Sequence, residues 1–237
     1  MSLIAGYLRV SVGILFTLVM AVAAIIAIPF DRHGRWYHGV SRFWSRVLLA
    51  ICGLNLSTRG TEKLNPAQAY IYVSNHASLL DIPVIVTGIP DQIRIVYKKE
   101  LEKIPVFGWG LKWGSYIGID RGKSAEAKKS LGEAIEKIRR GASVLLYAEG
   151  TRTGDGKLQP FKRGAFNLAM SAGIPVVPLT INGTYSIMPK GSLAIRPHPV
   201  ELVFSDPISV GPEEGKEAEL QLMEKVHAAI AQHYVDQ

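Results

Sequence analysis

The chain begins with one long apolar stretch and then changes to short segments of mixed character. Residues 10–30 contain no charged side chain over 21 positions. As a helix at 1.5 Å per residue this stretch would span about 31 Å, close to the thickness of a bilayer's hydrocarbon core. Residues 36–54 mix arginines with tryptophans and aliphatic residues, which is typical of a helix at a membrane interface. The alternative is a basic amphipathic helix packed on the catalytic domain. We therefore predict a hydrophobic two-helix membrane anchor over residues 1–54.

From residue 55 to residue 237 apolar runs alternate with helical periodicity, which predicts an α/β catalytic domain with a mixed sheet flanked by helices. The predicted strands are short runs rich in Val, Ile, Leu or Tyr, at residues 69–74, 94–97, 116–119, 143–148, 176–181 and 200–204. The predicted helices cover residues 124–140, 163–172 and 215–233. Ser124 can cap the first of them, and Gly141 can end it.

Positive charge is concentrated near the predicted anchor. The chain carries a net charge of +7, and residues 1–53 hold five arginines against Asp31, which accounts for +4 of it. Four of these arginines follow the apolar stretch, so the positive-inside tendency predicts a protein of the cytoplasmic (inner) membrane with its catalytic domain facing the cytoplasm. The same charges would rest on anionic headgroups if both helices dipped into one leaflet. Both topologies stay open.

The sequence argues against a cleaved signal peptide, a nucleic-acid partner and a site built from cysteines. A cleaved signal peptide would explain the small residues Ala21-Val22-Ala23, but the apolar stretch is long for a signal core and a second membrane-like segment follows it. No helix-turn-helix, zinc or RNA-binding signature accompanies the positive charge, so nucleic acid is not an expected partner. Cys52 is the single cysteine, which excludes an intrachain disulfide and a cysteine-based metal site.

Candidate catalytic chemistry follows the predicted strand at 69–74. His76 and Asp81 have four residues between them. An imidazole beside a carboxylate can remove a proton from an alcohol, because the carboxylate fixes the tautomer and stabilises the imidazolium that forms. Glu149 also follows a predicted strand, and ligands gather beyond the carboxyl ends of strands in α/β sheets. Asp81 lies where a helix begins, so capping that helix is its alternative role.

Four further blocks follow His76 and Asp81 along the chain. They are Lys98-Lys99-Glu100-Leu101 with residues 104–108, Gly118-Ile119-Asp120-Arg121, Glu149-Gly150-Thr151-Arg152, and Ile174-Pro175-Val176-Val177-Pro178. In this order the blocks resemble the membrane-bound glycerolipid acyltransferases, and among them the 1-acylglycerol-3-phosphate acyltransferases, over about residues 55–210. The first block and the Glu-Gly-Thr-Arg block form a specific signal together, although neither is specific alone.

The resemblance implies an activity and a set of residues. Such an enzyme transfers a fatty acyl chain from acyl-CoA or acyl carrier protein to the 2-hydroxyl of lysophosphatidic acid, giving phosphatidic acid in phospholipid synthesis. It implies that His76 and Asp81 are catalytic and that no metal or cofactor is needed. Its implied substrate-binding residues are Lys99, Arg121, Glu149, Gly150, Thr151 and Arg152. Membrane lipids are the further partners, and amides near residues 75–78 or at the next helix start are expected oxyanion donors.

Several alternatives remain at this stage. The acceptor is another lysophospholipid, or the protein is a membrane-associated thioesterase or a lipid-binding protein of the same fold. A serine hydrolase is disfavoured because the chain has no Gly-x-Ser-x-Gly elbow. Glu149 and Arg152 are alternatively a surface ion pair, and Lys162 and Arg163 either extend a basic patch or are simply solvated. The apolar residues 104–113 are core or the wall of an acyl-chain groove.

Overall fold

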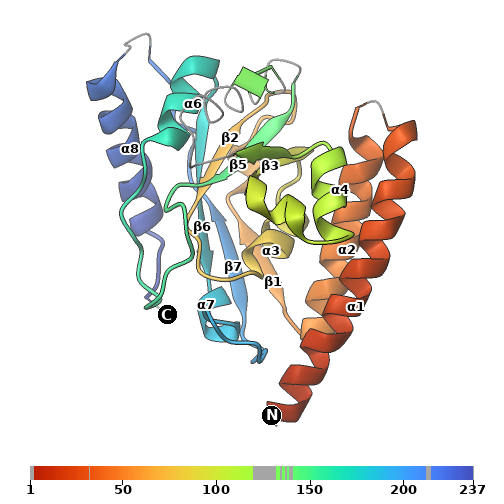
Figure 1. Ribbon diagram of the computed structural model, residues 1–237. Coiled ribbons are helices and arrows are strands. Elements are labelled where there is room, and N and C mark those ends of the chain that lie inside the picture. The colour runs from red at the N-terminus through yellow and green to blue at the C-terminus, as the bar shows by residue number, and fades with distance from the viewer. Residues whose placement is uncertain are drawn as a thin grey trace.

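The fold is built on one mixed sheet. The computed structural model describes residues 3–31, 33–119, 132–133, 135–136, 138, 141–211 and 215–236, and within these ranges it has seven paired strands (Figure 1). They are β1 (Leu56–Arg59), β2 (Ile71–Ser74), β3 (Ile93–Lys98), β4 (Ile117–Ile119), β5 (Ser143–Tyr147), β6 (Val176–Asn182) and β7 (Val200–Phe204).

The strands follow the order β1-β7-β6-β2-β5-β3-β4 across the sheet. The five strands from β6 to β4 run parallel, whereas β7 is antiparallel to β6 and parallel to β1. This arrangement confirms the prediction of an α/β fold with a mixed sheet flanked by helices. All six predicted strands are present, with ends shifted by at most two residues, and β1 is an addition.

Helices cover both faces of this sheet. They are α1 (Leu3–Ala27), α2 (Arg35–Cys52), α3 (Asp81–Gly88), α4 (Phe107–Trp113), α6 (Gly164–Ala172), α7 (Thr184–Ile187) and α8 (Lys216–Ala231), with short 3-10 turns η1 (Ile28–Phe30), η2 (Thr61–Lys63) and η3 (Lys99–Lys103). The helices α6 and α8 confirm the predictions at residues 163–172 and 215–233. The predicted helix at residues 124–140 lies mostly outside the described residues.

Successive side chains of a strand point to opposite faces of the sheet, so the protein has two apolar cores, one on each face. Ile71 and Val73 of β2 pack with residues of α6 and α8, such as Phe166 and Val226. Tyr72, between them in the sequence, belongs to the other core, which includes residues of α1, α2 and α3. Figure 1 shows α6 and α8 on one side of the sheet and α1 to α4 on the other. Because both faces are covered, β2 and β6 are buried at every position.

Both predicted N-terminal helices are present, and they differ from each other. The segment Ile4–Phe30 is, within the described residues, the one that is long and apolar enough to cross a membrane. The helix α2 is amphipathic instead, and it buries Tyr37, Leu49 and Cys52. These three side chains join the core that α3 and the sheet also form, so α2 covers the folded domain as well as contacting α1.

Polar contacts of α2 support the alternative of a helix packed on the domain. The guanidinium of Arg42 donates to the carbonyl oxygens of Ile89 and Pro90, at 2.9 and 3.3 Å. Trp44 donates its indole N–H to Thr17 of α1 at 2.9 Å. Arg42 therefore satisfies backbone carbonyls just beyond the end of α3, where the last carbonyls of a helix lack partners, and Trp44 joins α2 to α1.

Candidate active site

The order of the strands brings the sequence motifs together. The strands β2, β5 and β3 are neighbours and run parallel, and the residues that follow them are His76, Glu149 and Lys99. Their carboxyl ends therefore meet at one edge of the sheet, as expected for a ligand site in this fold class. Arg121, which comes after β4, lies outside the described residues.

His76 and Asp81 form a hydrogen-bonded pair. The distance from Nδ1 of His76 to Oδ2 of Asp81 is 2.7 Å. The Asp81 side chain is fully buried, whereas that of His76 is 17% exposed. An ionised carboxylate can only accept a hydrogen bond, so Nδ1 carries the proton and Nε2 keeps the lone pair. The pair is therefore oriented for Nε2 to act as a base toward a group that enters from solvent.

Asp81 also organises the loop that carries His76. Its Oδ2 accepts the backbone N–H groups of Ala77 at 2.7 Å and Ser78 at 3.0 Å. It is the first residue of α3 rather than its cap, and a helix N-terminus favours a negative charge there. Of the amides that we expected as oxyanion donors, those of Ala77 and Ser78 are thus engaged, and Leu80, just before α3, donates its N–H to Ser78 Oγ at 3.3 Å.

Glu149 binds the backbone of His76 rather than pairing with Arg152 at the surface. Its Oε1 accepts the N–H of His76 at 2.8 Å. Four residues further on, the N–H of Thr153 donates to the carbonyl oxygen of His76 at 2.9 Å. The segment that follows β5 therefore holds both backbone polar groups of His76. The sequence motif gave no sign of this arrangement, because it depends on β2 and β5 lying side by side.

The environment of Glu149 changes its ionisation. The pKa of its carboxyl is raised from 4.5 to about 8, because burial, together with the negative charge of Asp81, outweighs the lowering by the hydrogen bond from the His76 N–H. Near neutral pH Glu149 is therefore mostly protonated. A neutral carboxyl would not repel an anion bound beside it.

A Glu149→Gln substitution is expected to change how stability depends on pH. In the unfolded chain Glu149 ionises near 4.5, but in the folded protein it does so near 8, so wild-type stability falls as the pH rises between those values. The amide cannot ionise and its oxygen can still accept the His76 N–H. We expect the variant to gain stability relative to wild type from pH 5 to pH 8, on the order of 3 kcal/mol.

Chemical denaturation at a series of pH values measures this gain. The matched control is Glu217→Gln, since Glu217 is exposed in the first turn of α8, and its difference from wild type should stay flat. A Glu149→Gln difference that is equally flat across this pH range would contradict the assignment of a protonated Glu149.

Tyr147, the last residue of β5, was not singled out from the sequence. Its ring stacks on that of His76, with centroids 3.9 Å apart and planes inclined by 17°. Burial raises the pKa of its hydroxyl well above the ordinary value, so the residue stays neutral. Tyr147 pairs with Ser74 of β2 in the sheet. Tyr147 precedes Glu149 by two residues, and Ser74 precedes His76 by two residues. The stack fixes the plane of the imidazole, while the hydrogen bond to Asp81 fixes the direction of its Nδ1.

The remaining predicted binding residues surround the turn after β5. Gly150 has φ +74°, a conformation that favours glycine, and Thr151 is exposed beside it. Arg152 is partly exposed, and Lys99 begins the turn η3 directly after β3. The two cations thus come from neighbouring strand ends, on the same edge of the sheet as His76.

An apolar cavity of about 350 Å³ adjoins the catalytic loop. It lies among α1, α2, α3 and α4, and Leu79 and Leu80 of the loop between β2 and α3 form part of its wall. Phe107 and Leu111 of α4 line it as well, so part of the 104–113 stretch contributes to a groove. A volume of this size is in the range of small-molecule sites, and its lining suits a hydrocarbon chain.

Comparison with known proteins agrees with this geometry. A model of the Acyltransferase family matches residues 55–182, which include His76, Asp81 and the turn with Arg152. The chain belongs to the acyltransferase family. It is therefore a relative of proteins whose reaction is the transfer of an acyl group.

Individual members of the family match most of the chain. One is the chloroplastic 1-acyl-sn-glycerol-3-phosphate acyltransferase BAT2 of Brassica napus, 34% identical over 83% of this chain and 60% of its own length. Another is the 1-acyl-sn-glycerol-3-phosphate acyltransferase of Pseudomonas aeruginosa, 31% identical over 91% of this chain and 82% of its own length. The match spans 57–70% of the length of six plant and algal relatives.

A solved member of the family has the same fold. The crystal structure of the 1-acyl-sn-glycerophosphate (LPA) acyltransferase PlsC from Thermotoga maritima superposes with a TM-score of 0.74 at 26% sequence identity. The match covers 95% of this chain and 96% of that one. The coverage includes the N-terminal helices as well as the sheet, so the family resemblance extends over almost the entire chain.

Proposed function

We propose that this protein transfers a fatty acyl chain from an acyl thioester to the 2-hydroxyl of lysophosphatidic acid, giving phosphatidic acid. The observation that carries the proposal is the 2.7 Å pair of His76 and Asp81. The loop bearing this pair contributes to the apolar cavity, and its backbone is bound by the segment that bears Arg152. A base, a place for an acyl chain and a cationic turn thus meet, and the family relatives are named for this reaction.

The proposed reaction needs a single base. Nε2 of His76 removes the proton of the acceptor's 2-hydroxyl as that oxygen attacks the thioester carbonyl carbon. Asp81 stabilises the imidazolium through Nδ1–H. When the tetrahedral intermediate collapses, the C–S bond breaks, and the imidazolium returns its proton to the departing thiolate. The products are phosphatidic acid and a free thiol, and no acyl-enzyme forms.

Membrane association is a further part of the proposal. Many apolar side chains of α1 are exposed, and Trp109 and Trp113 of α4 are 46% and 53% exposed. Tryptophan favours the headgroup level of a bilayer. We infer that α1 and the tryptophan face of α4 meet the membrane of the cell. Residues 1–54 attach the catalytic domain of residues 55–237 to the cytoplasmic side of this membrane, as the N-terminal arginines indicate, and α2 also packs on that domain.

The test of this function is thiol release from an acyl thioester, measured with and without lysophosphatidic acid. Transfer requires the acceptor and gives phosphatidic acid, which mass spectrometry identifies. Hydrolysis releases thiol equally well without acceptor, and a lipid-binding protein releases none. Either of the last two results would replace the proposed function. Running the assay with acyl-CoA and with acyl carrier protein identifies the donor.

Arg152→Ala is expected to discriminate between acceptors. A guanidinium recognises a phosphate through two parallel charge-assisted hydrogen bonds, so its removal should lower kcat/KM for lysophosphatidic acid by roughly 10- to 100-fold. Transfer to a monoacylglycerol, which has no phosphate, should change little. Initial rates on both acceptors measure the effect. An equal loss on the two acceptors would assign Arg152 to the donor or to the structure.

A further inference from the structure

Lys162 lies against the turn that carries Arg152. Its backbone N–H donates to the carbonyl oxygen of Ala148 at 2.8 Å, which places it beside the end of β5. Its side chain then crosses Gly150: a methyl group added there would lie 2.9 Å from Cδ and 3.1 Å from Nζ of Lys162. Because Gly150 has no side chain, the aliphatic part of Lys162 can pack directly on the turn.

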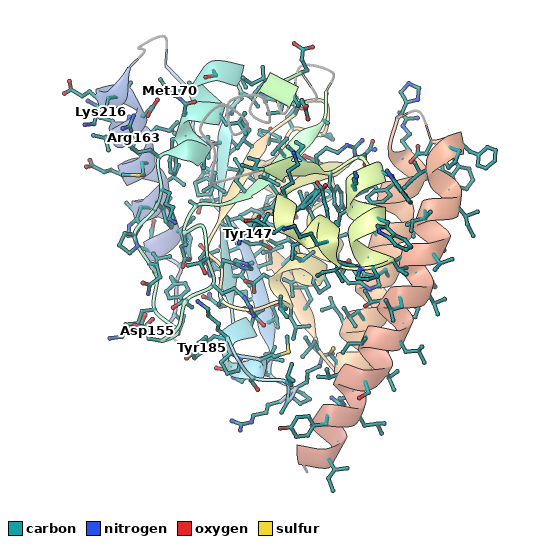
Figure 2. The ribbon with its side chains drawn as sticks, in the orientation of Figure 1. Tyr147, Asp155, Arg163, Met170, Tyr185 and Lys216 are labelled. Carbon is teal, nitrogen blue, oxygen red and sulfur yellow. The ribbon has the colours of Figure 1, made fainter. Side chains whose placement is uncertain are left out.

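Arg163, the next residue, has a different use. Its Nη2 and Nε lie 2.7 and 3.0 Å from Oε2 of Glu219, so it ties the start of α6 to α8. Figure 2 shows Arg163 on the side of α6 and α8. Of the two adjacent cations that the sequence left open, Arg163 thus has a carboxylate partner, whereas Lys162 lies at the turn after β5.

A second lysine reaches the same turn from another strand. Lys190 follows β6 and α7, and its Nζ lies 3.5 Å from the carbonyl oxygen of Arg152. The segment that bears it is fixed to the catalytic loop, because Ser78 Oγ donates to the carbonyl oxygen of Met188 at 2.8 Å. Lys190 belongs to none of the sequence motifs. It reaches the site because β6 is the other neighbour of β2.

The turn therefore collects three cations from separate parts of the chain, with Lys162 and Lys190 both exposed. Within the described residues, neither ammonium has a carboxylate within ion-pair distance. Like charges held near one turn repel each other, and a bound anion relieves that repulsion. A phosphate monoester has nearly two negative charges at neutral pH and three acceptor oxygens, which suits one guanidinium and two ammonium groups.

We infer that Lys162 and Lys190 bind, together with Arg152, the phosphate monoester of the lysophosphatidic acid acceptor, and so determine acceptor specificity. The inference rests on the proposed function and deepens it. The phosphate groups of a coenzyme A donor have the same chemistry, so the experiment varies donor and acceptor separately.

The test uses Lys162→Met and Lys190→Met in the full-length protein. Methionine keeps most of the aliphatic stem, so packing on Gly150 is retained while the charge is lost. We expect KM for lysophosphatidic acid to rise roughly 5- to 20-fold in each variant, with an unchanged KM for the donor and unchanged transfer to a monoacylglycerol. The matched control is Lys157→Met, because Lys157 is an exposed lysine of the same segment after β5 and should leave all constants unchanged.

Two results would overturn the inference. An unchanged KM for lysophosphatidic acid would remove the lysines from the acceptor site, and a rise only in the KM for acyl-CoA would assign them to the donor's phosphates. A separate measurement does not depend on turnover: acetylation of the lysines, followed by mass spectrometry, with and without millimolar sn-glycerol 3-phosphate. Lys162 and Lys190 should be protected and Lys157 not. Protection without any acyl transfer would reject the proposed function alone, and absent protection would reject the lysine site.

Discussion

Replacing His76 with alanine is expected to lower the rate of acyl transfer by roughly 10²- to 10⁴-fold, the usual effect of losing a general base, while the fold is retained. The imidazole contacts Asp81 and Tyr147. The contacts that hold the loop are made by the backbone of residue 76, to Glu149 and Thr153, and alanine preserves them. Steady-state rates measure the loss of activity, and a thermal unfolding curve tests whether the fold is retained.

A double-mutant cycle makes the test specific to the pair. Asp81→Asn alone should lower the rate strongly, because an amide cannot stabilise the imidazolium. In the His76→Ala background the same change should cost little further, since the group it supports is gone. His198→Ala is the matched control, because His198 is an exposed histidine outside the site. Near-normal turnover in a folded His76→Ala protein would reject the mechanism.

Deleting residues 1–53 is expected to abolish folding of the remaining chain, and with it activity on a short-chain, monomeric acceptor. Tyr37, Leu49 and Cys52 of α2 are buried in the core shared with α3 and the sheet. Each buried apolar side chain of this kind contributes about 1.5–3 kcal/mol, and a domain is stable by only about 5–15 kcal/mol. Loss of cooperative thermal unfolding, followed by circular dichroism, is the expected result.

A shorter deletion, of residues 1–30, is the comparison for this prediction. It removes α1 and keeps α2. In α1 the helix side chains are mostly exposed or partly buried, with few exceptions such as Ala24, so we expect a folded protein that has lost one wall of the apolar cavity and its attachment to membranes. A soluble, cooperatively folded protein lacking residues 1–53 would show instead that both helices serve only as an anchor.

Much of the sheet was predictable because its strands are buried on both faces and read as continuous apolar runs. The strand β1 was missed for the opposite reason. Its sequence Leu56-Ser57-Thr58-Arg59 has three polar residues, three of its positions are exposed, and among the described strands it pairs with β7 alone, at the sheet edge. Pairing with a distant strand, rather than its own composition, makes it a strand.

The helix α4 was missed because two glycines weaken its helical signal. Packing requires the first of them, because a methyl group at Gly108 would lie 2.5 Å from backbone carbonyl oxygens of the preceding turn. A methyl group at Gly110 would meet Ala21 and Ile25 of α1 at 3.9 Å, which is an ordinary contact. Such close approaches between elements are set by tertiary structure, which a single sequence does not display.

In the site, too, local features could be predicted from the sequence and features that depend on tertiary structure could not. The pairing of His76 and Asp81 could be predicted, because both lie in one short motif whose chemistry is local. The roles of Glu149, Tyr147 and Lys190 could not, since each depends on which strands are neighbours of β2. A sequence motif identifies residues of the site, whereas the order of the strands determines which of these residues are in contact.

The double attachment of the His76 backbone has a mechanical consequence. Because the N–H of His76 binds Glu149 and its carbonyl binds Thr153, the catalytic base and the Arg152 turn form a single closed ring of chain and cannot shift independently. An insertion or deletion within residues 150–152, made to fit a larger headgroup, would therefore also move the imidazole. Acceptor preference in this fold should change through side chains that reach the turn from outside the ring, as those of Lys162 and Lys190 do.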